Sequence, residues 1–281
     1  MIEDGREFGI CREIIVKYLS LVILAVGLHD FSVNALRAHY SMLFPQGVSA
    51  RPGQPVTILF QWGHPFEHQL ADASPPESLI ALSPSGKKID LTKAQEEVAL
   101  PGSDGKSIRA FQFRFTAEER GDFVFVLHGK PVWMEEDRVF LLDTVQVVLH
   151  VQAQKGWDAS IGKGIEMTPL TRPYGLQPGM VFQTRVLAGG QALAGTVVEV
   201  ERYNPSPPAN LPADEHITRT AKTDSGGIVT VSLMEPGWWG LTASRDGGTK
   251  EHDGRTYPVR ERVTLWVFVD DPKTMHITAP K

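Results

Sequence analysis

Four side chains in the first quarter of the chain carry donor atoms that could bind a metal ion. They are His39, His64, Glu67 and His68. Imidazole nitrogens together with a carboxylate oxygen suit nickel, copper, zinc and cobalt alike. A helix that begins at Pro65, or equally a loop, would bring His64 and His68 together. The alternative is a polar loop whose histidines bond only to backbone or water.

The residues before His39 have the order of a Sec-type signal peptide. A charged stretch over residues 1–17 precedes an uncharged apolar run from Tyr18 to Leu28, and the polar segment that follows ends at Ala38. We expect export to the periplasm and cleavage after Ala38. His39 would then begin the mature protein. It would carry a free amine and an imidazole on one residue, a chelate for a borderline-soft metal ion.

The apolar run is too short for a stable membrane anchor. Its eleven residues would rise about 16 Å as a helix, roughly half of the ~30 Å hydrocarbon core. The single cysteine, Cys11, precedes the run, whereas a lipid-modified cysteine would follow it. We therefore expect a mature chain without cysteine, disulfides or thiolate metal ligands.

Composition and motifs argue against two broad classes of function. The chain has a formal net charge of −5 and no basic patch, so nucleic acid is not an expected partner. It also has no nucleophile elbow, no His-Glu-x-x-His sequence and no phosphate-binding glycine loop. The sequence does not predict an enzyme.

The elements that must position these side chains are predicted to be strands. Short runs with period-2 alternation are separated by turn residues, which is typical of antiparallel β-sandwiches. The runs are 56–60, 79–82, 108–115, 122–128, 144–151, 181–187, 197–203, 217–223, 228–233, 240–244 and 263–269. The fold class predicted is all-β.

The alternation stops near residue 155 and resumes after residue 164. This break predicts two antiparallel sandwich domains, an Ig-like one over residues 39–155 and a second over residues 156–281, after a signal peptide over residues 1–38. The second half has strands joined by a Pro-rich loop and an Asp-Gly type turn. It resembles the carboxypeptidase-regulatory or prealbumin-like sandwich.

Two strand segments allow predictions about single residues. In the run 108–115, Phe113 and Phe115 should be buried, while residues 109, 112 and 114 face solvent. Adjacent residues of a strand face opposite sides, so Trp238 and Trp239 should pack against different surfaces, at least one of them core. A stacking platform for sugars is the functional alternative for these two rings.

A set of motifs spread over the chain resembles one bacterial family. The motifs are Ala38-His39-Tyr40-Ser41-Met42-Leu43-Phe44-Pro45, Gly63-His64-Pro65-Phe66-Glu67, Gly156-Trp157-Asp158, Pro169-Leu170-Thr171-Arg172-Pro173-Tyr174-Gly175-Leu176, Pro236-Gly237-Trp238-Trp239-Gly240 and His252-Asp253-Gly254. The family comprises exported proteins described as the periplasmic component of a cobalt or nickel ABC-type uptake system.

The resemblance implies a metal-binding or metal-delivery accessory. Its cargo would be cobalt or nickel, with copper or zinc as further candidates, and its partners would be components of a membrane metal-uptake transporter. It also adds His252 to the candidate metal ligands, although the local sequence by itself predicts an exposed hairpin turn there. His128 and His150 end apolar runs and are expected to be structural.

Two other functions stay open at this point. The sandwiches could form a scaffold or binding module for a protein or glycan, with the histidines incidental. A copper oxidoreductase could use an amino-terminal histidine and a second histidine to hold one copper ion, as lytic polysaccharide monooxygenases do. The similarity to those enzymes ends at the terminal histidine.

Overall fold

The computed structural model describes residues 39–102 and 105–273. The predicted signal peptide, residues 1–38, lies outside the described residues. Within these residues the fold is built from strands, with one short α-helix, α2 (Asp214–Ile217), and one 3-10 turn, η1 (Thr92–Ala94). The predicted all-β class is confirmed.

The first sheet lies in the N-terminal half and is antiparallel. In spatial order it contains β1 (Tyr40–Pro45), β2 (Pro55–His64), β7 (Ser107–Thr116) and β6 (Gln95–Pro101), with β3 (Gln69–Ala71) paired to β2. In β7, Phe113 and Phe115 are buried, Arg109 and Arg114 are exposed, and Gln112 is partly exposed. The register predicted for this strand is confirmed.

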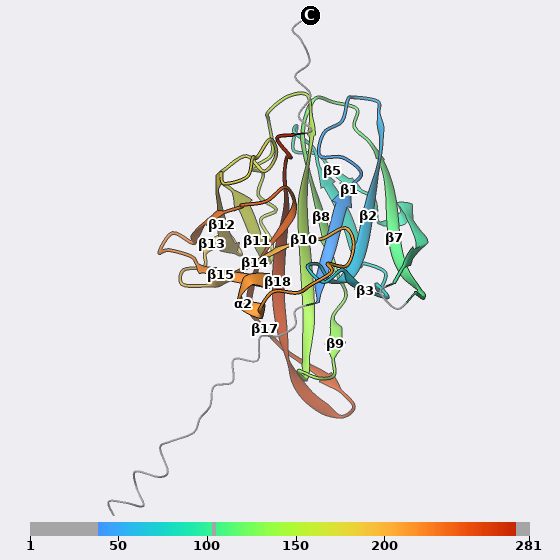
Figure 1. The fold of residues 1–281 in the computed structure, drawn as a ribbon, viewed down its shortest axis with the longest axis vertical. Coiled ribbons are helices and arrows are strands. Elements are labelled where there is room, and N and C mark those ends of the chain that lie inside the picture. Colours follow the sequence, from blue (N-terminus) through green and yellow to red (C-terminus); the bar gives the residue numbers. More distant parts are fainter. Residues whose placement is uncertain (1–38, 103–104, 274–281) are drawn as a thin grey trace, which may run out of the picture. The chain divides into compact units, whose positions relative to one another are not determined.

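The second sheet contains strands from both halves of the chain. Its order is β15 (Thr218–Lys222), β14 (Val197–Arg202), β17 (Gly237–His252), β18 (Arg255–Val269), β10 (Val139–Val151), β8 (Gly121–His128), β4 (Ser78–Leu82) and β5 (Lys88–Asp90), with β9 (Val132–Met134) paired to β10. The junction is the parallel pairing of β10 with β18, which lie side by side in Figure 1.

The third sheet belongs to the C-terminal half. It contains β11 (Ile165–Pro169), β12 (Val181–Ala188) and β13 (Gln191–Ala192), with β16 (Ile228–Ser232) paired to β12. Its pairings are antiparallel.

Two hydrophobic cores lie on opposite faces of the second sheet. Leu265 and Trp266 are neighbours on β18, yet Leu265 belongs to the core under the third sheet and Trp266 to the core under the first. The same alternation holds on β17, where Trp239 is buried in one core and Trp238 packs against the other. Successive side chains of a strand point to opposite faces, so one sheet serves both cores.

These observations correct the expectation of two separate sandwiches. Except for Trp266, the buried residues of the first core lie between residues 40 and 151, and those of the second between residues 165 and 269. The predicted boundary near residue 155 thus separates these two cores, whereas a smaller third cluster packs Tyr174 against Val124, Val126 and Val148 from the other side of that boundary. The boundary does not separate the sheets, because the hydrogen bonds between β10 and β18 continue one sheet through both halves. Residues 39–102 and 105–273 accordingly belong to one compact unit.

Candidate functional site

The imidazole rings of His39 and His64 lie next to each other. Their ring centroids are 4.3 Å apart, with an interplanar angle of 50°. His64 ends β2, and His39 directly precedes β1. The antiparallel register pairs Tyr40 with Gly63. This pairing places the two histidines at the same end of the strand pair. Strand pairing therefore brings together two residues that are 25 positions apart in the sequence.

The ring of His39 is held in place and electrically neutral. It stacks on Trp62, with centroids 4.2 Å apart and planes 14° from parallel. Burial, and then the charges of His64 and Arg262, lower the pKa of His39 to about 4. Its buried Nδ1 atom has no hydrogen-bond partner among the described residues. At neutral pH this ring is therefore an unprotonated imidazole whose Nδ1 is not used by the fold, the form that binds metal ions.

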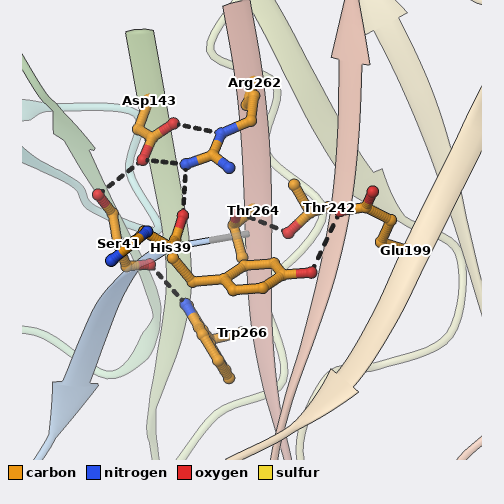
Figure 2. A network of polar contacts seen from close by, with 9 residues as sticks. His39, Ser41, Asp143, Glu199, Thr242, Arg262, Thr264 and Trp266 are labelled. Atoms are coloured by element: carbon orange, nitrogen blue, oxygen red, sulfur yellow. Dashed lines mark hydrogen bonds and ion pairs between the residues drawn. The ribbon is translucent and has the colours of Figure 1, made fainter. Parts of the chain in front are cut away.

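A buried ion pair holds the backbone at His39. Arg262 on β18 donates from Nη2 to the carbonyl oxygen of His39 at 2.7 Å, and from Nε and Nη2 to the two carboxylate oxygens of Asp143 at 2.7 and 2.8 Å. Both side chains are almost fully buried. Figure 2 shows the guanidinium between the carboxylate of Asp143 and the main chain of His39.

Two further hydrogen bonds hold Ser41, the second residue of β1. The hydroxyl of Ser41 donates to Asp143 at 2.8 Å, and the indole Nε1 of Trp266 donates to the carbonyl oxygen of Ser41 at 3.0 Å (Figure 2). The donors come from β1 and β18, and Asp143 comes from β10. The position of His39 is thus fixed by the junction at which the two halves share a sheet.

The structure directs Glu67 and His68 towards the C-terminal half. The Nδ1 atom of His68 lies 2.8 Å from the carbonyl oxygen of Asn204, to which it donates. Burial raises the pKa of Glu201 to about 7, and the nearby charge of Glu67 contributes in the same direction. One carboxylate oxygen of Glu67 is buried without a hydrogen-bond partner among the described residues. These two candidates face Asn204 and Glu201.

His252 lies in a different part of the fold. Its ring contacts Trp133, Phe140 and Tyr257, with centroids 4.7 to 6.4 Å apart. Arg262, which bonds to His39, is paired with Ser244 on β17, and His252 is eight residues further along that strand. At about 3.3 Å per residue this is a separation on the order of 25 Å. One metal ion cannot contact both His252 and His39.

The side chains of the described residues do not by themselves complete a metal site. Nowhere in residues 39–102 and 105–273 do three or more His, Cys, Asp or Glu side chains gather in a geometry that could hold a metal ion. The two imidazoles of His39 and His64 are adjacent, but a third donor would have to come from elsewhere. No helix in this part of the chain is long and apolar enough to cross a membrane.

Sequence reasoning missed the residues that support the histidine pair. Asp143 had a detectable signal, because it is an acidic residue inside the long apolar strand 139–151; buried charges are usually paired. Arg262 directly precedes the apolar run 263–269 and gave a similar but weaker signal. Trp62 and Asn204 had no local signal. His150 donates to the buried Asp122 at 2.7 Å and stacks on Tyr174, in line with a structural role.

Similar proteins give the chain a family and no established activity. No curated protein matches it. Among solved structures, it is similar to a Salmonella alpha-2-macroglobulin, with 14% sequence identity over 83% of this chain and 15% of that chain and a TM-score of 0.23. It is also similar to a two-domain fibronectin type III segment of chicken tenascin, with 10% sequence identity over 83% of this chain and 100% of that chain and a TM-score of 0.21. The chain thus spans less than a sixth of that macroglobulin. The family model of the domain of unknown function DUF4198 matches residues 36–247, and the chain belongs to this family.

Proposed function

We propose that the exported chain, beginning at His39, binds a divalent transition metal ion and hands it to a membrane uptake system. The donors are the terminal amine and Nδ1 of His39 and the imidazole of His64. Cobalt or nickel is the cargo implied by the family resemblance, and the periplasm is the compartment implied by the signal peptide. The transporter as partner rests on the same resemblance.

The observation that carries this proposal is the state of the His39 ring. A buried polar atom usually has a hydrogen-bond partner, because burial without one is unfavourable. The Nδ1 atom of His39 is buried without a partner among the described residues, and the ring of His64 is 4.3 Å away. The low pKa of His39 keeps the ring unprotonated at neutral pH, so protons compete little with a metal ion there.

A terminal amine supplies the donor that the side chains lack. Two imidazoles alone bind a metal ion weakly, and the described side chains bring no third ligand to them. Cleavage after Ala38 would free the main-chain nitrogen of His39. Its amine, with an ordinary pKa of about 8, deprotonates readily in competition with a metal ion. The donors would then be three nitrogens, a set that suits nickel, copper and cobalt.

The anchoring of His39 supports this role. A residue that only connected a leader to a domain would need no fixed position. Instead, the carbonyl oxygen of His39 accepts a hydrogen bond from the buried Arg262, and its ring stacks on Trp62. A chelate whose atoms are held before the ion arrives loses less entropy on binding, which increases affinity.

Titration of the protein beginning at His39 with Ni²⁺ and Co²⁺ by isothermal calorimetry tests the proposal. We expect one ion per chain. His64→Ala removes one strong ligand and should weaken binding at least about tenfold. A tenfold change in affinity corresponds to about 1.4 kcal/mol of binding free energy. His216→Ala, which changes an exposed histidine elsewhere, should leave binding unchanged. Equal affinities of the wild type and His64→Ala would contradict the proposal and favour a binding module that acts without metal.

A further inference from the structure

The turn that follows His64 is fastened to the C-terminal half by one residue, Asn204. The main-chain nitrogen of Asn204 donates to the carbonyl oxygen of Pro65 at 3.0 Å, and its side-chain Nδ2 donates to the carbonyl oxygen of Phe66 at 2.6 Å. His68 closes the contact by donating from Nδ1 to the carbonyl oxygen of Asn204 at 2.8 Å. Asn204 thus bonds to three of the four residues in the turn 65–68.

The side chain of Asn204 is itself held in one orientation. Arg202 donates from Nη1 to its Oδ1 atom at 3.0 Å. The same Nη1 forms an ion pair with Glu235 at 3.0 Å. Because Oδ1 accepts from a guanidinium, Nδ2 must face Phe66. The hydrogen bond to the turn is therefore fixed from both sides.

The turn also has a backbone that needs outside support. His68 has a φ of 53°, in the left-handed region that residues other than glycine seldom adopt. Such conformations persist when the surrounding structure holds them, and they gather at functional sites. The contact between His68 and Asn204 supports this conformation, together with the pairing of β2 with β3 on either side of the turn.

We propose that His68 and Asn204 are positioning residues for the metal site. They fix the turn 65–68, and through it they hold the ring of His64 beside the ring of His39. This inference rests on the proposed metal-binding function and assigns His68 a role other than that of ligand. Its Nδ1 atom donates to Asn204, and among the described residues its ring does not gather with those of His39 and His64 into a group that could hold a metal ion. The residue therefore acts through the backbone that follows His64. Groups that orient a ligand in this way commonly tune metal affinity.

The variant His68→Asn distinguishes a positioning role of His68 from a role as metal ligand. The Nδ2 atom of an asparagine can occupy the place of the histidine Nδ1 and donate to the same carbonyl oxygen, and asparagine tolerates the left-handed backbone. His68→Asn should therefore keep the Ni²⁺ affinity within about twofold of the wild type. His68→Ala loses the hydrogen bond and should bind Ni²⁺ about three- to tenfold more weakly. If His68 were a ligand, both variants would lose it.

A second pair of variants tests Asn204. Asn204→Ala should weaken Ni²⁺ binding by about three- to tenfold through loss of the bond to Phe66. Asn204→Asp, which keeps the shape but loses the Nδ2 donor, should do the same and replaces the alanine variant if that variant does not fold. Asn210→Ala, in the exposed loop beyond Asn204, is the matched control and should bind like the wild type. Thermal unfolding confirms that each variant is folded.

Electron paramagnetic resonance with Cu²⁺ supplies a readout that general destabilisation would not change. The wild type and all four variants at positions 68 and 204 should show the same number of coordinated nitrogens. His68→Ala and both Asn204 variants should add a second, broader species, because His64 is less well placed. Unchanged Ni²⁺ affinity and Cu²⁺ spectra in His68→Ala and both Asn204 variants would overturn the positioning role alone. The loss of one coordinated nitrogen in His68→Asn would do the same. A wild type that binds neither Ni²⁺ nor Cu²⁺ would overturn the proposed function and this inference together.

Discussion

The guanidinium of Arg262 donates a hydrogen bond to the carbonyl oxygen of His39, 2.7 Å away, across 223 positions of sequence. The same guanidinium is paired with Asp143 on the neighbouring parallel strand. The junction that joins the two halves into one sheet therefore also fixes the residue at which the chain would begin after cleavage. The stability of the fold and the geometry of the proposed site depend on the same ion pair.

Asp143→Ala should destabilise the protein strongly. It leaves the buried charge of Arg262 without its partner, and breaking a buried pair from one side costs about 3–5 kcal/mol. Urea unfolding followed by circular dichroism measures the loss. Glu96→Ala, which breaks the exposed pair with Arg114, is the control and should cost less than about 1 kcal/mol. Similar losses in the two variants would show that Arg262 is stabilised without Asp143.

The imidazole of His39 should titrate near pH 4 in the metal-free protein. Its pKa is lowered from 6.5 to about 4, first by burial and then by the charges of His64 and Arg262. The unfolded chain binds the proton more tightly, so the stability that the neutral ring contributes is present above pH 6.5 and is lost as the pH falls towards 4. Proton NMR of the ring, assigned with a His39→Gln variant, gives the midpoint. A midpoint near 6.5 would contradict the partly buried position of the ring.

Glu201→Gln should flatten the pH dependence of stability between pH 4.5 and 7. Burial raises the pKa of Glu201 from 4.5 to about 7, so the folded state binds the proton more tightly than the unfolded chain does. The stability that the protonated carboxyl group of Glu201 contributes is fully present below pH 4.5 and is lost as the pH rises through 7. Urea midpoints of the two proteins, measured across this range, should diverge as the pH rises. Glu215→Gln, at an exposed position, should follow the wild type, and parallel curves for Glu201→Gln would contradict the assignment.

Gly63→Ala should be more destabilising than Gly53→Ala. Both glycines have positive φ values, 144° and 77°. A methyl group at Gly63 would collide with the carbonyl oxygen of Gln69, whereas one at Gly53 would meet nothing within 4 Å. We expect a loss of about 2–3 kcal/mol at Gly63 and of about 1 kcal/mol at Gly53, from differential scanning calorimetry. Equal losses would mean that β3 moves away from β2 without penalty.

Strands with one solvent-exposed face could be predicted from the sequence. Strands that are buried on both faces could not. The run 108–115 alternates, and its burial follows the alternation. All six residues of β1 are buried, so Tyr40–Pro45 has no period-2 signal, although His39 of the proposed site directly precedes this strand. The parallel pairing of β10 with β18 was also missed, because strand order is a long-range property that local patterns do not contain.

The residues of the candidate site could also be predicted only in part. His39 and His64 could be selected by residue type and by the position of the expected cleavage site, and the β1–β2 register brings their rings together. The grouping with His252 came from a shared motif, and the length of the β17–β18 hairpin separates it from the pair. Asn204 could not be found, because its role depends on main-chain atoms of a turn more than 130 positions away.

The central claim is that the free amine of His39 is a metal ligand. Calorimetric titration with Ni²⁺ of two forms of the protein, one beginning at His39 and one with a single glycine before it, tests this claim most directly. The glycine moves the charged amine away and leaves an amide in its place, while every side chain is kept. The account predicts binding at least about tenfold weaker in the extended form. Equal affinities of the two forms would contradict the amino-terminal chelate.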